Sequence, residues 1–155
     1  EGGVRSDNGQ ADTGTTSDFD YAAAMIGAYG YTPNDRRHSL KLFGNSMLFA
    51  MTGGIADILA MAKNLDVDPV EAIGVFTRFN AAAALTGRAQ KIAHGDFSAS
   101  FELTMARKDI RLMLEAAGQE ALVSLPSIAQ RMDEAIAAGH GKDDLGAIAA
   151  ASLKR

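Results

Sequence analysis

The sequence predicts an all-α protein of six or seven helices arranged around one long central helix. Apolar residues make up 47% of the chain but aromatic residues only 6%, and alanine is used heavily, which is typical of packed helices rather than of a β-sandwich. Only three prolines interrupt the 155 residues, and no segment has the pattern of a convincing strand. This length is that of one domain with a single hydrophobic core.

The long helix is expected to span residues 33–63. Thr32 is suited to be its N-cap, Pro33 its first residue, and Asp35 the partner in a capping box. Asn64 tolerates the left-handed conformation in which many helices end. Apolar residues cover nearly the whole circumference of this helix, so it must be buried on several sides, either as the central rod of its own domain or in a subunit interface.

Shorter helices are predicted before and after the long one. The first, at residues 21–29, follows a polar segment, residues 1–17, that has too few apolar side chains to build a core. Asp68-Pro69-Val70-Glu71 repeats the capping pattern and begins a helix whose apolar residues recur at helical spacing as far as Phe79. Glycines and a proline separate four further helices, expected at about 81–94, 101–117, 126–138 and 144–153.

The composition argues against several classes of partner. The net charge is −4 and the basic residues are scattered, so no basic surface is expected to bind nucleic acid. The apolar run Met47–Met51 is broken by Thr52 and two glycines and falls short of the roughly 20 residues of a membrane span. The chain has no cysteine, which is compatible with a cytoplasmic protein, and it has neither an HExxH pattern nor an acidic cluster, so no metal site is expected.

Lys41 and Asn45 form the first candidate site. They stand four residues apart and therefore share one face of the long helix, although their neighbours are apolar. In one interpretation Lys41 runs its stem along the core and reaches water. In the other the pair lines a partly desolvated cleft, where the pKa of Lys41 falls toward neutrality and the residue can deliver a proton to an oxygen. His38, one turn earlier, is a weaker candidate for a proton relay.

The second candidate site is the segment Phe101–Asp109, FELTMARKD. Lys108 and Asp109 fall near the middle of a predicted helix whose apolar positions include Phe101 and Met105. The segment is either a solvated run of charges, joined by two neighbouring arginines, or the wall of a cleft. The chain has no GxGxxG or P-loop pattern, so a phosphate-binding loop is expected to lie elsewhere.

Four segments, in this order and at these distances, carry a resemblance to a known family: SLKLFGN, GGIADILAMAKNLDVDP, FELTMARKDIRLMLEAAG and AAGHGKDDLGAIA. They resemble the C-terminal domain of the β-hydroxyacid dehydrogenases, which include 3-hydroxyisobutyrate dehydrogenase and glyoxylate reductase. The resemblance covers about residues 35–150. It implies the all-α fold of 6-phosphogluconate dehydrogenase C-terminal domains, NAD or NADP as the cofactor, and a small hydroxyacid or aldehyde as the substrate.

The resemblance also implies roles for single residues. Lys41 matches the catalytic lysine, which handles the proton of the substrate oxygen, and Asn45 matches a residue that helps to hold the substrate. Lys108 matches the lysine that closes over the cofactor, and Phe101 and Asp109 match residues that shape the far wall of the cleft.

The same resemblance sets expectations for the domains and partners. Residues 18–34 are expected to be at most the remnant or exit of a Rossmann domain, and residues 35–155 the helical substrate and dimerisation domain. Without the Rossmann domain the chain is expected to be inactive and to form a homodimer or larger assembly. Arg36, Arg37 and His38 stand where the family usually has small residues, so the substrate stays open. The alternative function is a non-catalytic helical dimerisation or interaction module.

Overall fold

The computed structural model describes residues 36–153, without the side chains of residues 36–39, 41, 81, 82 and 84. The chain divides into two units between residues 48 and 49, and α2 (Arg36–Asn64) begins in the first unit and ends in the second. The predicted helix at 21–29, the predicted capping residues Thr32 and Asp35, and the segments 1–17 and 18–34 lie outside the described residues.

The all-α fold is confirmed. After α2 the chain forms α3 (Pro69–Gly74), α4 (Ala81–Ala93), α5 (Leu103–Ala117), α6 (Leu125–Ala135) and α7 (Ala150–Leu153). Three short turns complete the helical structure: the 3-10 turns η1 (Val75–Thr77) and η3 (Leu145–Ala149), and the π-helical turn η2 (Ile136–His140). Residues 36–153 contain no strand, and the single β-bridge among them joins Glu102 to Asp144.

The predicted cap at Asp68 is confirmed, but the helix that it begins is shorter than expected. The Asp68 carboxylate accepts hydrogen bonds from the amides of Val70 and Glu71, at 2.8 and 3.1 Å. The helix then ends at Gly74 and gives way to η1 instead of continuing to Phe79. A competing helix start explains this, because the Asn80 side chain accepts a hydrogen bond from the amide of Ala83 and caps α4.

The C-terminal end of α2 lies where the sequence predicts it, but the left-handed residue is a different one. Asp66 has a φ of 55°, whereas Asn64 is the last helical residue. The Asn64 side chain instead donates a hydrogen bond to the carbonyl of Ala116, at 2.9 Å, near the end of α5. Lys63 pairs with Glu120 at 2.8 Å, so side-chain contacts with the α5–α6 region stabilise this helix end.

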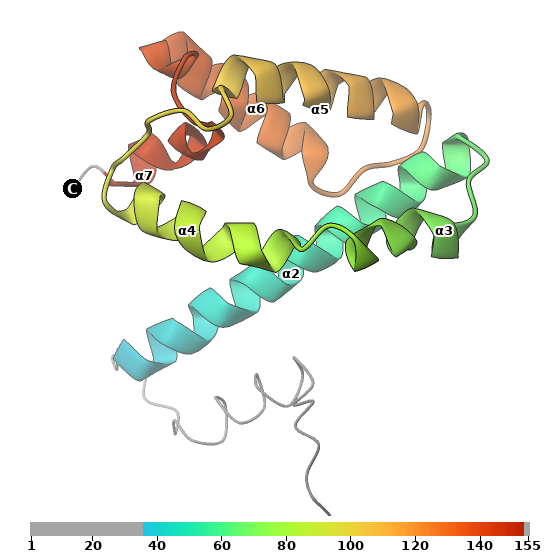
Figure 1. Ribbon diagram of the computed structural model, residues 1–155, viewed down its shortest axis with the longest axis horizontal. Coiled ribbons are helices and arrows are strands. Elements are labelled where there is room, and N and C mark those ends of the chain that lie inside the picture. Colours follow the sequence, from blue (N-terminus) through green and yellow to red (C-terminus); the bar gives the residue numbers. More distant parts are fainter. Residues whose placement is uncertain (1–35, 154–155) are drawn as a thin grey trace, which may run out of the picture. The chain divides into compact units, whose positions relative to one another are not determined.

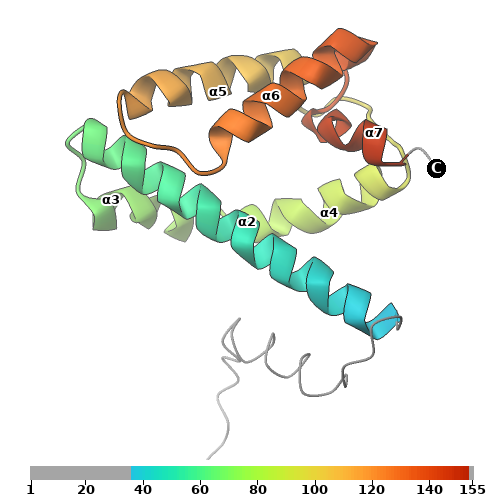
Figure 2. The same cartoon turned by 180° about the vertical axis from the view of Figure 1, so that it is seen from behind.

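The core of the second unit lies between α5, α6 and η3. Figure 1 shows α5 and α6 side by side, and Figure 2 shows the pair from behind. Both helices are amphipathic, and their apolar faces meet in a cluster that η3 completes. The buried members of the cluster are Leu103, Ala106, Ile110, Ala129, Met132 and Ala147.

In contrast, most apolar side chains of α2 are exposed. Phe43 is 65% exposed and Phe49 is 72% exposed, and only Gly53, Asp57 and Ala62 are buried among residues 42–64. The described part of the chain therefore does not provide the cover that the apolar circumference of this helix requires.

The apolar stretch of α2 extends well beyond the run Met47–Met51 that the sequence suggested was too short for a membrane span. Leu42–Asn64 is 23 residues long and apolar enough to cross a membrane, with a mean hydropathy of 1.3 in an 18-residue window, because Thr52, Gly53 and Gly54 do not interrupt the helix. One such helix is weak evidence for a membrane protein. Asp57, in its second half, is 1% exposed and accepts hydrogen bonds from the loop before α6, so this part of the helix packs against protein.

Candidate functional site

The first predicted pair, Lys41 and Asn45, lies on the part of α2 that belongs to the first unit. The helix is continuous here, so the two residues are one turn apart and share a face. Asn45 is half-buried, while the neighbouring Leu42 and Phe43 are exposed. The side chain of Lys41 lies outside the described residues, as does that of His38, and their roles in proton transfer stay predictions.

The second predicted set lies on α5 and just before it, in the second unit. This helix has two apolar faces. One face, with Leu103, Ala106 and Ile110, is buried in the core. The other carries Met105 and Leu112, which are 48% and 46% exposed, and Phe101, which is 38% exposed, lies before the helix begins. The apolar residues that the sequence places near Lys108 are thus not the core face of the helix but an exposed face.

Lys108 and Asp109 differ from the charged residues around them. Arg107 donates two hydrogen bonds to the Asp133 carboxylate of α6, at 2.8 and 3.0 Å, and this pairing lowers the pKa of Asp133. Arg111 pairs with Glu115 one turn along α5. Within residues 36–153, neither Lys108 nor Asp109 has an ion-pair partner, and both are exposed. The two arginines have structural partners, so the segment is not a uniform run of solvated charges.

Backbone hydrogen bonds fix the position of Phe101. Its carbonyl accepts a hydrogen bond from the amide of Leu145 at 2.8 Å, and its amide donates to the Asp144 carboxylate at 3.2 Å. Asp144 is 4% exposed and also accepts hydrogen bonds from Ser100 and Gly146. Burial alone would raise the pKa of Asp144, but these hydrogen bonds outweigh it and hold the pKa well below the usual carboxyl range.

A second buried carboxylate, Asp57, organises the start of α6. Its carboxylate accepts hydrogen bonds from three successive amides, those of Val123, Ser124 and Leu125. These amides lie at the start of α6, where the helix itself provides no acceptors for them. Neither Asp57 nor Asp144 was predicted from the sequence as a functional or structural centre. A lone acid within the apolar run IADILA was a signal for Asp57, since a carboxylate on an apolar helix needs a partner.

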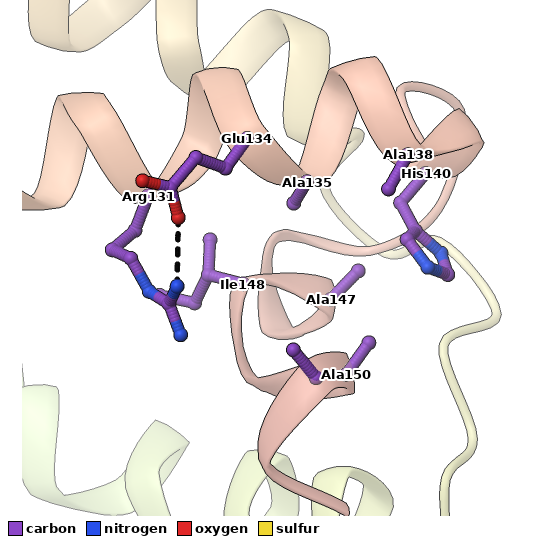
Figure 3. Close-up of a pocket in the computed structure, with 9 residues that line it drawn as sticks. Arg131, Glu134, Ala135, Ala138, His140, Ala147, Ile148 and Ala150 are labelled. Carbon is purple, nitrogen blue, oxygen red and sulfur yellow. Dashed lines mark hydrogen bonds and ion pairs between the residues drawn. The ribbon is translucent and has the colours of Figure 1, made fainter. Parts of the chain in front are cut away.

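The hollow shown in Figure 3 is separate from these residues. It has a volume of about 110 Å³ and is lined mainly by alanines of α6, η2, η3 and α7. Arg131 in its lining is paired with Glu134 at 2.7 Å, so its charge is already matched. None of the predicted site residues lines this hollow, and we do not assign it to the candidate site.

The structure therefore describes the candidate site in two parts. Phe101 lies just before α5, and Lys108 and Asp109 are exposed on that helix, while Lys41 and Asn45 belong to the first unit. The described residues contain no group of three His, Asp or Glu side chains that could hold a metal ion. His94 is the C-cap residue of α4, and His140 is the last residue of η2.

A comparison with models of known protein families shows the family to which the chain belongs. The model of the family described as NAD-binding of NADP-dependent 3-hydroxyisobutyrate dehydrogenase matches residues 38–152. The chain belongs to this family. The resemblance stated from the sequence is thereby confirmed, and the chain is related to the dehydrogenase-type oxidoreductases that use NAD or NADP. A search of curated proteins finds no significant match.

Proposed function

We propose that the chain is the substrate-binding and dimerisation domain of an NAD(P)-dependent oxidoreductase that interconverts a β-hydroxyacid, or a similar small alcohol, and its carbonyl form. The observation that carries the proposal is the extent of the family match, because residues 38–152 include every predicted site residue. In this proposal the domain orients the substrate and handles its proton, and turnover also requires a dinucleotide-binding domain.

In the proposed reaction, hydride transfer depends on the cofactor, and proton transfer depends on Lys41. The nicotinamide cofactor accepts or supplies the hydride at the carbon that bears the oxygen. Lys41 takes the hydroxyl proton during oxidation and returns it during reduction, which is the task of a general acid–base residue. Asn45, one turn further along α2, hydrogen-bonds the substrate and keeps it beside Lys41.

The exposed face of α5 supports an assignment of Lys108 to the cofactor. The ammonium of Lys108 has no ion-pair partner in the described part of the chain, and Met105 and Leu112 beside it are about half exposed. A cationic group next to an apolar surface suits a ligand that is both anionic and aromatic, as a nicotinamide dinucleotide is. Phe101 and Asp109 shape the same side of the cleft in this proposal.

The proposal includes a homodimer, with α2 in the interface. Large apolar side chains are exposed along the helix: Leu42, Phe43, Met47, Phe49, Met51, Ile55 and Leu59. Patches of this kind on a protein surface mark interaction sites. The two glycines in the middle of α2 differ in the space around them. A side chain at Gly53 would collide with Ser124 of the same chain, whereas Gly54 has no neighbour within 4 Å and is open to a second helix.

Substitutions at the two glycines test the dimer. Gly54→Leu should weaken self-association while leaving the free energy of unfolding of the monomer nearly unchanged, and Gly53→Leu should destabilise the chain itself. Light scattering over a range of concentrations measures the association, and chemical denaturation measures the stability. A wild-type mass of one chain at high micromolar concentration would contradict the dimer.

A fused protein tests the oxidoreductase function. The chain is joined to the dinucleotide-binding domain of a 3-hydroxyisobutyrate dehydrogenase, and NAD(P)H formation is followed with small β-hydroxyacids. Lys41→Ala should remove most of the turnover without unfolding the protein. Lys63→Ala is the matched control, because Lys63 lies on the same helix and makes an exposed ion pair with Glu120. Equal turnover of Lys41→Ala and wild type would favour the non-catalytic helical module.

A further inference from the structure

The buried carboxylate of Asp144 joins three segments that are far apart in the sequence. One oxygen, Oδ2, accepts hydrogen bonds from the Ser100 amide at 3.0 Å, the Ser100 hydroxyl at 2.7 Å and the Phe101 amide at 3.2 Å. The other oxygen, Oδ1, accepts from the amide of Gly146 at 3.0 Å and caps η3. Arg88 of α4 lies 4.0 Å from Oδ1.

The start of α5 depends on the same turn of the chain. Glu102 occupies the N-cap position of α5 but makes no capping hydrogen bond with its side chain. The first amides of the helix, Leu103 and Thr104, instead donate to the carbonyls of Asp143 and Gly141, at 2.8 and 3.0 Å. The amide groups that usually need a capping side chain are therefore bound by the turn at residues 141–144.

We propose that Asp144 is a positioning residue that holds Phe101 and, through the first turn of α5, Lys108 in the cofactor-binding arrangement. This inference rests on the proposed function for the roles of Phe101 and Lys108. Its own content is structural: a carboxylate outside the candidate site fixes the backbone from which two site residues extend.

Charge and shape both explain why a carboxylate is needed at this position. Four donors converge on the two oxygens, and a carboxylate offers acceptors only. An asparagine of the same shape would place an NH₂ donor against either the Gly146 amide or the Ser100 and Phe101 amides. Asp144→Asn is therefore expected to release residues 100–104 without changing the volume of the site.

The experiment compares Asp144→Asn with Asp57→Asn in the full 155-residue chain. The control is matched, because Asp57 is also buried and also binds successive amides, but those of residues 123–125. Hydrogen exchange of single amides is measured by NMR. Millimolar NADPH is then added, and the shifts of the amides of residues 101–109 are recorded.

Asp144→Asn should speed exchange at Phe101, Leu103 and Thr104 by about tenfold more than it speeds exchange at the core residues of α6, Ala129 and Met132, and it should remove the shifts caused by NADPH. Asp57→Asn should loosen residues 123–125 and leave the NADPH shifts in place. If Asp144→Asn prevents folding, Ser100→Ala, which removes a single hydrogen bond to the carboxylate, should show the same changes to a smaller extent.

Two results would overturn the inference. The first is an unchanged rate of hydrogen exchange at residues 101–104 in Asp144→Asn, or in Ser100→Ala if Asp144→Asn does not fold. The second is an equal increase in the exchange rate of these residues in Asp57→Asn. A failure of the proposed function would appear in a different measurement, the NADPH titration. If NADPH shifts no amide of the wild-type chain, the assignment of Lys108 to the cofactor fails, while the exchange data still decide whether Asp144 positions this segment.

Discussion

Asp57→Asn is expected to destabilise the protein by loosening the start of α6. The Asp57 carboxylate is 1% exposed, and it accepts the amide hydrogen bonds of Ser124 and Leu125 on one oxygen and that of Val123 on the other. Asparagine keeps the size of the side chain but replaces one oxygen with an NH₂ donor. At least one amide then loses its acceptor, and the remaining hydrogen bonds lose the negative charge.

The magnitude follows from these contacts. A buried donor left without a partner costs about 1–3 kcal/mol, and a hydrogen bond to a charged group contributes about 1 kcal/mol more than a neutral one. Water can partly replace the acceptor, because Val123 is 67% exposed. We therefore expect a loss of about 3 kcal/mol in the free energy of unfolding, a large share of the stability of a small protein.

Urea denaturation followed by far-UV circular dichroism measures this loss. Asp133→Asn is the comparison, because Asp133 is a surface carboxylate paired with Arg107, and its replacement should cost much less than that of Asp57. A loss below about 1 kcal/mol for Asp57→Asn would refute the argument that this carboxylate stabilises the start of α6.

Two further predictions concern stability. Because hydrogen bonds hold the pKa of Asp144 below its value in the unfolded chain, its contribution is fully present above about pH 5 and is lost as the pH falls through the acidic range; Asp144→Asn should therefore flatten acid unfolding curves. Gly118→Ala should cost about 1–3 kcal/mol, because Gly118 has a φ of 59° and a Cβ there would lie 2.6 Å from Oδ1 of Asn64. The matched control Gly87→Ala, in the middle of α4 with no neighbour within 4 Å, should be neutral or stabilising in the same thermal unfolding assay.

Local patterns in the sequence predicted the helices well, since caps and breakers are short-range features. The Asp68 cap and the extents of α4 and α5 agree with the structure to within two residues. The predicted helix at 126–138 continues as the π-helical turn η2 after Ala135, and the one at 144–153 is α-helical only from Ala150 to Leu153. Two other errors arose where local signals competed. The Asn80 cap ended the run of helical spacing before Phe79, and Asp66 instead of Asn64 took the left-handed conformation.

Features that depend on distant residues were not predictable in this way. Asp57 binds amides more than 60 residues away, and Asp144 binds amides more than 40 residues away, so no local pattern reveals their partners. Spacing also could not show which apolar face of α5 is buried, because Phe101 and Met105 form as regular a pattern as Leu103 and Ile110. Spacing pointed to Lys41, Asn45 and the segment Phe101–Asp109 only as one of two interpretations, and their roles came from the family resemblance, whereas the helical fold came from the residues themselves.

The central claim is that Lys41 handles the substrate proton while hydride passes between the substrate and a nicotinamide. The most direct measurement is isotope transfer in the fused protein, with NADPH deuterated at the transferring position of the nicotinamide ring and the carbonyl form of the substrate. Mass spectrometry should find deuterium at the hydroxyl-bearing carbon of the product, and Lys41→Ala should slow its appearance by about 100-fold or more. Product without the label, or equal rates for Lys41→Ala and wild type, would contradict the claim.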